Sequence, residues 1–502
     1  MKYKRLLTTL CVAFILGSCS KEALDTNPTS GISVETAFTT VDNAQKALNG
    51  LYRILYTQYV NQHRDGHGAN MINLDAMGED YVRTNSSYVY HYQSYRWLAH
   101  RSASDTNVNE FAYTFYYIVI SNANMLIANI DAATGAEATK IAIKGEALAL
   151  RAWAHFYLVQ LYGKRYDDSA KPNNQPGVPI MITTSTEGQP RASVEAVYAQ
   201  INKDLDDAMA ALSTVAPATT RSGVAKTHIN INVVKGFKAR VALTMQNWAD
   251  AIKYAKEARA GVDNLMTNAQ YLGGFTDIDN SEWLWGVMQP TDQVPTYGSF
   301  YSYMSANFNS AFTRVNPKLI NSLLYAKISA TDIRKKLWWD GTVADRANFP
   351  TISGQTKVIY MHRKYMVPDV STRAGHIPFM RIAEMYLIEA EAQARSGNNT
   401  AAAQALFPLA KNRDARYVLS NKSGAALIDE IMIQRRVELW GEGFRFLDLK
   451  RTNADLDRRG ANHKSDVANI LFVPAGDLSW QWLIPQDEIN SNPAIEPADQ
   501  NP

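Results

Sequence analysis

QRRVELWGEGFRFLDLKR, residues 434–451, is the stretch that decides how this chain is interpreted. It combines eight charged and three aromatic side chains in eighteen positions. An apolar helical pattern that begins at Ile428 leads into it, and Gly441 and Gly443 are placed to end or bend that helix. Such a density of charge fits a catalytic centre, a nucleic-acid surface or a structural clamp, so the spacing of the acids decides among them.

Glu438 and Glu442 lie one helical turn apart, and Arg435 or Arg436 is within reach of a glutamate three or four residues on. A catalytic carboxylate pair needs two acids held apart in environments that separate their pKa values. Neighbouring acids that arginines compensate are typical of a paired structural network or of a solvated face. The residues alone therefore predict a structural clamp or a solvated face, and not a catalytic site.

Helical periodicity dominates three further regions, and it predicts a mainly α fold. Apolar residues recur at spacings of three and four across IKGEALALRAWAHFYLVQLYG at 143–163 and SVEAVYAQINKDLDDAMAAL at 193–212. The same pattern runs through 379–407, where Met380 is expected on the apolar face of a helix. Gly397 and Asn398 supply a turn there, and Thr400 is expected to cap the next helix.

Two stretches, 379–407 and 233–261, each show a helix, a short turn and a second helix over about thirty residues, which is the footprint of a tetratricopeptide-like pair. Neither matches the full consensus. Unrelated antiparallel helix hairpins are the alternative, because they place the same small alanines where helices cross. Stacked pairs of either kind predict a helical scaffold.

Residues 60–110 are rich in Tyr, Asn, His and Ser, and residues 262–375 are rich in Gly, Pro and aromatics. Both regions are predicted to form loops carried by the helical scaffold. Within the second, SEWLWGVMQ at 281–289 alternates as a short strand with two apolar faces, and Trp283 and Trp285 are expected in the core.

The net charge of +3 has its origin at the N-terminus, where Lys2, Lys4 and Arg5 precede an apolar run. A basic segment followed by a short apolar one predicts a secretion signal over residues 1–18. Its removal lowers Lys+Arg from 51 to 48 against 48 acids, so the remaining chain is formally neutral. Nothing then favours a nucleic-acid partner.

Leu16-Gly17-Ser18-Cys19 resembles a bacterial lipobox, with an ordinary signal peptide as the alternative. The resemblance implies that Cys19 is lipidated and that its acyl chains anchor the protein in membrane lipid. Cleavage leaves this single cysteine, so no intrachain disulfide is expected. Residues 19–35 are polar and turn-rich, as in a flexible tether. The apolar stretch at 111–130 is interrupted by Ser and Asn, so we expect a buried helix and no membrane span.

Patterns for other kinds of site are weak. HRDGH at 63–67 places two histidines four residues apart, but its glycine and the missing HExxH pattern argue against a zinc site. The chain has no Walker loop, no dinucleotide fingerprint and no nucleophile elbow, although a Ser-His-Asp arrangement in space stays open. We therefore expect no catalytic residue, no metal and no cofactor.

With these features in place, residues 434–451 resemble the C-terminal signature of the SusD/RagB family of outer-membrane nutrient-binding lipoproteins. The matching positions are Arg435, Arg436, Glu438, Leu439, Gly441, Glu442, Gly443, Arg445, Asp448, Leu449 and Arg451. Gln434 departs from the glutamate that the family often has, and the N-terminal loop region has its own composition. Further family-like segments follow in order over almost the whole chain: the lipobox, TAFTTVDNAQKALNGLYR at 36–53, RAWAHFYLVQLYG at 151–163, GVPI at 177–180, KGFKARVAL at 235–243, TDIRKKLWW at 331–339, MRIAEMYLIEAEA at 380–392 and LIPQDEI near the end.

The resemblance implies a tetratricopeptide-like helix-pair scaffold with a loop-rich ligand-binding face and a few short strands. It implies a non-enzymatic lipoprotein, anchored in the outer membrane at the cell surface, that presents glycans to a SusC-like TonB-dependent transporter. We expect an N-terminal part at 36–260 and a C-terminal part at 261–502, packed as one globular unit. A helical glycoside hydrolase and a tetratricopeptide adaptor that binds only protein are the alternatives.

A sugar site needs exposed aromatic planes beside hydrogen-bonding side chains. Residues 80–97 and the loop that follows 281–289 supply both, and the resemblance places part of the glycan face there. Most of these rings are expected in the core, with two to four of nine in contact with ligand. The candidate ligand-binding residues are Trp97, Tyr81, Tyr301, Tyr297, Tyr95, Arg83 and Asp80, of which the first three are foremost.

Overall fold

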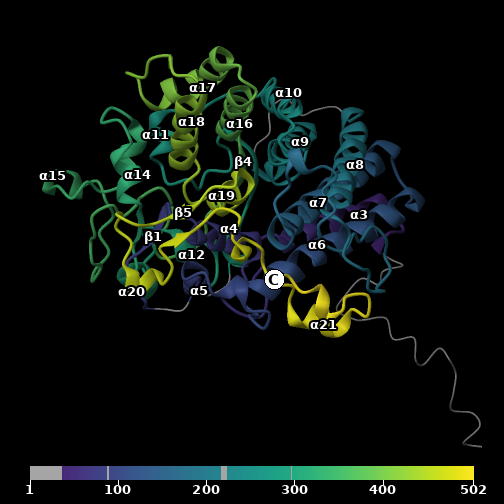
Figure 1. Cartoon of the computed structure of the whole chain (residues 1–502). Helices are drawn as coiled ribbons and strands as arrows, with labels where there is room; N and C mark the ends of the chain where they lie inside the picture. The colour runs from purple at the N-terminus through teal and green to yellow at the C-terminus, as the bar shows by residue number, and fades with distance from the viewer. Residues whose placement is uncertain (1–36, 88–89, 216–222, 295–296) are drawn as a thin grey trace, which may run out of the picture.

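The computed structural model describes residues 37–87, 90–215, 223–294 and 297–502. The signal peptide expected at 1–18, Cys19 and the tether expected at 19–35 lie outside the described residues. Long helices occupy the right and the top of Figure 1, and short helices and strands lie at the left and lower left. The prediction of a mainly helical fold with a few short strands is confirmed.

Helices of eight residues or more form the scaffold. Within the described residues they are α3 (Val41–Ile54), α4 (Gly66–Met77), α6 (Asn109–Asn129), α7 (Glu137–Tyr162), α8 (Val194–Ser213), α9 (Ile231–Thr244), α10 (Trp248–Arg259), α16 (Ile382–Arg395), α17 (Asn399–Arg413), α18 (Gly424–Glu438) and α19 (Arg445–Thr452). Neighbouring helices pack in the order α6, α7, α8, α9, α10, α16 and α17. The helices on both sides of residue 260 are therefore in direct contact.

Shorter elements fill the face beside the scaffold. The helices among them are α5 (Tyr92–Tyr95), α11 (Asn268–Tyr271), α12 (Phe300–Met304), α13 (Ala311–Val315), α14 (Ser322–Ala326), α15 (Val343–Arg346), α20 (Ser465–Ala468) and α21 (Gln486–Ser491). The strands form three antiparallel pairs: β1 (Tyr81–Arg83) with β3 (Lys318–Ile320), β2 (Trp283–Val287) with β4 (Ile377–Arg381), and β5 (Leu456–Asp457) with β6 (Phe472–Val473).

Both predicted helix pairs are confirmed, as α9 with α10 and α16 with α17. The side chain of Asn247 accepts a hydrogen bond from the backbone N–H of Asp250 and so caps α10. The expected cap at Thr400 is wrong. Helix α17 begins at Asn399 with Asn398 at the N-cap position, so Thr400 lies inside the first turn.

Met380 lies in a strand, and its expected place on a helix is wrong. It is paired with Trp285 across β2 and β4, and α16 begins only at Ile382. The hydrogen bonds of the neighbouring strand hold this segment extended. Apolar spacing alone does not separate a short buried strand from the first turn of a buried helix.

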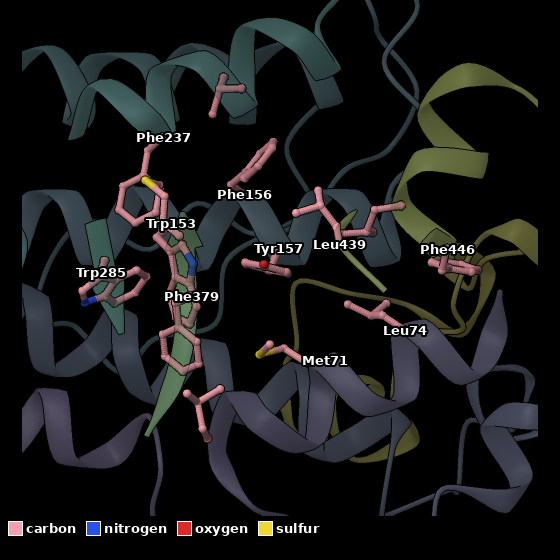
Figure 2. Close-up of a cluster of buried hydrophobic side chains, with 14 of the residues drawn as sticks. Met71, Leu74, Trp153, Phe156, Tyr157, Phe237, Trp285, Phe379, Leu439 and Phe446 are labelled. Carbon is pink, nitrogen blue, oxygen red and sulfur yellow. The ribbon is translucent and has the colours of Figure 1, made fainter. Parts of the chain in front are cut away.

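The strand pair β2–β4 lies in the main hydrophobic core, where helices α4, α7 and α9 meet it (Figure 2). The ring centroid of Trp285 lies 5.1 Å from that of Phe379, 5.5 Å from Phe237 and 5.8 Å from Trp153. Trp283 and Trp285 are 2% and 0% exposed. Their predicted place in the core is confirmed.

One stretch of the described chain, Asn109–Ala132, is long and apolar enough to cross a membrane by length and composition. Of its most apolar window, 56% is buried inside the protein. Core helices of soluble proteins pass the same test, and the contacts of α6 with α3 and α7 agree with the predicted buried helix.

The charged stretch at 434–451 is a buried clamp, which is one of the two structures predicted for it. Glu438, at the end of α18, accepts hydrogen bonds from Arg381 at 2.9 Å, Arg413 at 3.0 Å and Arg334 at 3.2 Å. Arg381 and Arg413 also pair with the buried carboxylate of Glu282. All five side chains are at most 2% exposed, so the network joins five separate segments inside the protein.

Glu442 extends the same network. Its Oε1 accepts from Arg381 and from the ammonium of Lys364, both at 2.6 Å. Burial by itself would raise the pKa of Glu438, but Arg413, Arg381 and Arg334 hold it well below the usual range. Burial acts in the same way on Glu442, whose pKa is lowered by Arg381 and Lys364. Both acids are therefore held ionised as structural anions.

The expected pairing of Arg435 or Arg436 with a glutamate of the same helix is wrong. Arg435 donates to Asp448 at 2.7 Å, and Arg436 pairs with Asp80 at 2.5 Å. The two arginines point away from the helix toward neighbouring elements, while the glutamates meet arginines from elsewhere. Arg435 thereby joins α18 to α19, and Arg436 joins α18 to the segment that precedes β1.

Candidate functional site

Four of the rings expected at the glycan face lie inside the protein. Tyr81, Tyr95, Trp97 and Tyr301 are between 0% and 4% exposed. The indole Nε1 of Trp97 donates to the carbonyl oxygen of Met77 at 2.7 Å. The expectation that Trp97, Tyr81 and Tyr301 offer exposed ring planes is wrong, because the β1–β3 pair and the packing of short helices turn the rings inward. Their faces are occupied by protein and are unavailable for stacking on a sugar.

The two charged candidates, Arg83 and Asp80, are also buried, so their expected exposure to ligand is wrong. Arg83 donates to three backbone carbonyl oxygens of the segment that follows β1. Asp80 accepts from Arg436 within the clamp. Both side chains position backbone and helices in this structure.

Tyr297 differs from the other candidates, because 54% of it is exposed. It follows the short 3-10 helix η6 (Thr291–Gln293). The next residue, Gly298, packs closely against Gln58 and Gln62 of the loop that follows α3. Tyr297 therefore has the exposed ring that was expected of it, and its contact with a ligand stays a prediction.

A hollow of about 230 Å³ opens beside the start of this loop. It is bounded by the last turns of α3, by the 3-10 helix η5 (Gly223–Thr227) and by residues 286–293. Its lining includes three rings and three side chains with amide or guanidinium groups: Tyr52, Tyr56, His228, Asn49, Arg53 and Gln293.

Glu146 of α7 holds two of these rings in place from behind. Its Oε2 accepts from the hydroxyl of Tyr52 at 2.5 Å and lies 2.9 Å from Nδ1 of His228. The hydroxyl oxygen of Tyr52 also accepts from the backbone N–H of Ile229 at 2.8 Å. The ring centroids of Tyr52 and His228 are 4.5 Å apart. A buried carboxylate therefore fixes a joined pair of rings at the back of the hollow.

Tyr56 also lines the hollow. Its hydroxyl donates to Oε1 of Gln293 at 2.9 Å, which joins α3 to η6. Burial raises the pKa of Tyr56, with a smaller lowering by Arg53 and a smaller raising by Asp292. The ring therefore stays neutral at physiological pH.

The lining of this hollow suits the binding of a sugar better than its cleavage. Aromatic faces accept the apolar face of a sugar, and amide and guanidinium groups bond its hydroxyls. Among the described residues that line it there is no carboxylate. An acid and base pair for glycoside hydrolysis therefore has no counterpart in the lining.

A second hollow is larger, at about 360 Å³, and lies between residues 164–175, the end of α19 and residues 476–481. Its one lining ring in the described chain is Trp480, which is 5% exposed, whereas the smaller hollow has the half-buried rings of Tyr56 and His228 in addition to Tyr52, which is also 5% exposed. Lys450 lines it, but the ammonium donates to the carbonyl oxygens of Gln160, Leu161 and Gly163 at the end of α7. We favour the smaller hollow because ring faces, and not volume, decide a sugar site.

Titratable groups elsewhere form no alternative centre in the described chain. His67 of the HRDGH pattern is packed among aromatic rings, and burial lowers its pKa to about 3. Among the described residues there is no group of three metal-ligating side chains. Burial raises the pKa of Asp65 well above its usual range and that of Asp75 to about 8. Both acids lie at or within α4 and line neither hollow.

Sequence reasoning missed Tyr52, Tyr56 and His228. Tyr52 and Tyr56 are spaced four residues apart in NGLYRILY, so they share one side of α3 and its extension. That spacing was a usable signal. His228 joins them only through the contact of η5 with β2, which no local pattern reveals.

Comparison with known proteins covers almost the whole chain. A family profile described as starch-binding associating with outer membrane matches residues 24–243, and the profile of the SusD family matches residues 245–502. The border between the two matches falls at the end of α9, inside a packed helix pair. The SusD-like protein P38 of Formosa agariphila is 22% identical over 91% of this chain and 93% of its own.

Solved structures share the fold. A SusD-like carbohydrate binding protein from Bacteroides vulgatus is 27% identical, with a TM-score of 0.78 over 93% of this chain and 99% of its own. A laminarin binding SusD-like protein superposes with a TM-score of 0.71 at 19% identity, over 93% of this chain and 100% of its own. Together with the profile that spans residues 245–502, these matches show that the chain belongs to the SusD family.

Proposed function

We propose that this protein is a cell-surface lipoprotein that binds oligo- or polysaccharides and delivers them to a SusC-like TonB-dependent outer-membrane transporter. The observation that carries the binding step is the hollow lined by Tyr52, Tyr56 and His228. Tyr297, four residues after the lining residue Gln293, adds an exposed ring. The carbohydrate-binding relative at 27% identity supports the same ligand class.

Location and delivery rest on sequence features. The LGSC motif supports an anchor at Cys19, and the profile described as associating with the outer membrane supports that membrane. Delivery to a transporter rests on the family resemblance alone. A soluble adaptor that binds only protein predicts neither an anchor nor retention of glycan.

Binding without turnover is the activity that the geometry supports best. A helical glycoside hydrolase needs two carboxyl groups flanking the bond to be cleaved, one of them with a raised pKa. Burial raises the pKa of Asp65 and Asp75, but both acids are enclosed beside or within α4. The hollow supplies faces and donors for binding, and it lacks this pair among its described lining.

Calorimetric titration with a glycan selected from an array tests the site. Tyr56→Ala is expected to weaken binding about tenfold, or about 1.4 kcal/mol, because one stacking face is lost. Tyr297→Ala is expected to weaken it as well. Tyr325→Ala, on the distant helix α14, is the matched control and should bind as the wild type does.

The buried candidates give the contrasting outcome. Trp97→Ala is expected to lower stability by about 3–5 kcal/mol, as large core truncations do, while the folded fraction keeps its affinity. Wild-type affinity in both Tyr56→Ala and Tyr297→Ala would place the glycan elsewhere. Loss of affinity in a normally stable Trp97→Ala would return the site to residues 80–97.

A further inference from the structure

Lys318, in β3, is a buried cation without a hydrogen-bond acceptor. The residue is 2% exposed, and its Nζ has no hydrogen-bond partner in the described part of the chain. The ammonium lies 3.9 Å from the ring centroid of Phe312, a cation–π contact. A buried ammonium without acceptors is strongly disfavoured. Either the amine loses its proton, or an anion balances its charge.

A second cation, Arg83, acts on Lys318. Arg83 stands directly opposite it in the β1–β3 pair, and the guanidinium Cζ lies 5.9 Å from the same Phe312 ring. Burial lowers the pKa of Lys318 well below its usual range, and Arg83 lowers it further. The two strands therefore present two basic side chains toward one ring.

A third donor lies two residues before Lys318. Asn316 is 0% exposed, its Oδ1 accepts from the hydroxyl of Thr84 at 3.2 Å, and its Nδ2 has no partner among the described residues. With the hydroxyl of Thr84 donating to Oδ1, the side-chain atom of Asn316 left without a partner is the donor Nδ2. Lys318 and Asn316 thus offer N–H groups that the described chain leaves unanswered.

Two histidines of the described chain, His91 and His362, are coupled electrostatically to Lys318. On the loop before α5, burial lowers the pKa of His91 well below its usual range, and His63, Arg83 and Lys318 lower it further. Burial lowers the pKa of His362 to about 3, with further lowering by Lys318 and Lys364. Both imidazole rings are therefore neutral, and neither adds charge beside Lys318.

We propose that Lys318, Asn316 and Arg83 form an internal site for one small monovalent anion, either a halide ion or a small carboxylate such as formate. The anion answers the open donors and allows Lys318 to keep its proton. Arg83 also holds three carbonyl oxygens of the segment after β1. The bound anion thereby ties that segment to the β1–β3 pair, independently of the glycan hollow.

Diffraction from wild-type crystals grown in sodium bromide locates such an ion directly. The expected result is an anomalous bromide peak within hydrogen-bond distance of Nζ of Lys318. Replacement of that peak by normal density when bromide is exchanged for formate would identify the carboxylate as a second occupant. Bromide crystals with no anomalous peak there would overturn the proposal.

Thermal unfolding at constant ionic strength gives the solution test. Chloride, bromide or formate is expected to raise the melting temperature of the wild type above its value in gluconate, which is too large to enter. The gain should shrink as pH rises, because the anion is bound by the protonated form of Lys318. Lys318→Met should lose the gain and be at least as stable as the wild type in gluconate.

Lys335→Met is the matched control. Its ammonium also lies over a ring, 4.8 Å from the centroid of Tyr325, but it donates to the carbonyl oxygen of Ile328 at 2.7 Å. This variant should keep the wild-type response to small anions. An equal response in Lys318→Met and the wild type would contradict the proposal, and the bromide crystals decide the question if Lys318→Met does not fold.

Discussion

At the scale of single residues, Glu438 shows how a motif that looks catalytic serves the fold. Three guanidinium groups from different elements surround its carboxylate, and all of them are buried. Such a group is costly to bury and costlier to leave without a partner. The sequence predicted a clamp or a solvated face from its mixture of signs. The sequence could not identify Arg334, Arg381 and Arg413 as the partners of Glu438, because they lie 104, 57 and 25 residues away.

Glu438→Ala should lower the free energy of unfolding by roughly 3–5 kcal/mol, because it removes one carboxylate partner from each of three buried guanidinium groups. Urea denaturation measures the change. The matched control is Glu257→Ala, which removes a partly exposed ion pair with Lys235 at 3.2 Å and should cost at most about 1 kcal/mol. Equal stabilities of the two variants would contradict the clamp. Glycan affinity of the folded fraction should be unchanged in both.

Asp75 supplies a pH dependence of the opposite sign to that of the clamp acids. Burial raises its pKa to about 8, although the N–H of Gly443 and the charge of Lys364 act to lower it. Asp75 is protonated in the folded protein, so its stabilising contribution is complete below about pH 4. That contribution is lost progressively as pH rises toward 8, where the unfolded chain has long been ionised.

Asp75→Asn should therefore be more stable than the wild type, by an amount that grows from pH 5 to pH 8 at up to roughly 1.4 kcal/mol for each pH unit. The amide oxygen keeps the hydrogen bond from Gly443. Denaturation curves at several pH values measure the difference. A difference that is constant over this range would show that Asp75 is not protonated in the fold.

At the scale of elements, the turn between α18 and α19 is set by glycine. Gly443 has a φ of +82°, and a Cβ on it would lie 2.8 Å from the Cα of Met71 in α4. The sequence predicted a bend at this position. It did not reveal that α4 packs there, because the contact joins segments far apart in the chain.

Gly443→Ala should destabilise the protein by more than backbone strain alone, because the backbone of α4 must move. Gly397→Ala is the control: φ is +83° there, with no atom within 4 Å of the added Cβ. It should cost about 1 kcal/mol. Similar melting temperatures for the two variants would mean that the α4 contact is loose.

Elements set by local spacing were predicted correctly, and those set by contacts between distant segments were not. Repeated spacing located α7, α8 and both helix pairs, since each helix buries its own apolar face. Met380 was misplaced because pairing with Trp285 is a tertiary contact. Polar neighbours favoured an exposed position for Tyr81 and Trp97. Those neighbours instead bond backbone and clamp residues.

At the scale of the whole molecule, the long helices form a scaffold and the shorter elements pack beside it. The hollow forms where α3, η5 and the end of β2 meet. The family and the architecture could be predicted from the sequence, because ordered motifs run along almost the whole chain. The hollow could not, since it needs Tyr52 and His228 side by side from positions 176 residues apart.

The anchor is a prediction at this scale. In cells, surface protease should remove the wild-type protein, and Cys19→Ala should leave the outer-membrane fraction, because no acyl chain then holds it. Fractionation and protease shaving of intact cells measure both. Cys19→Ala protein that stays in the outer membrane with unchanged exposure would rule out the lipid anchor.

The central claim is that this protein binds glycans and does not cleave them. The most direct measurement incubates the purified chain with a polysaccharide panel and follows both retention and product release. The account predicts saturable retention of at least one glycan, weakened in Tyr56→Ala, with no shortened oligosaccharide at any time. Time-dependent product release that a single Asp or Glu substitution abolishes, or no retention of any glycan, would contradict it.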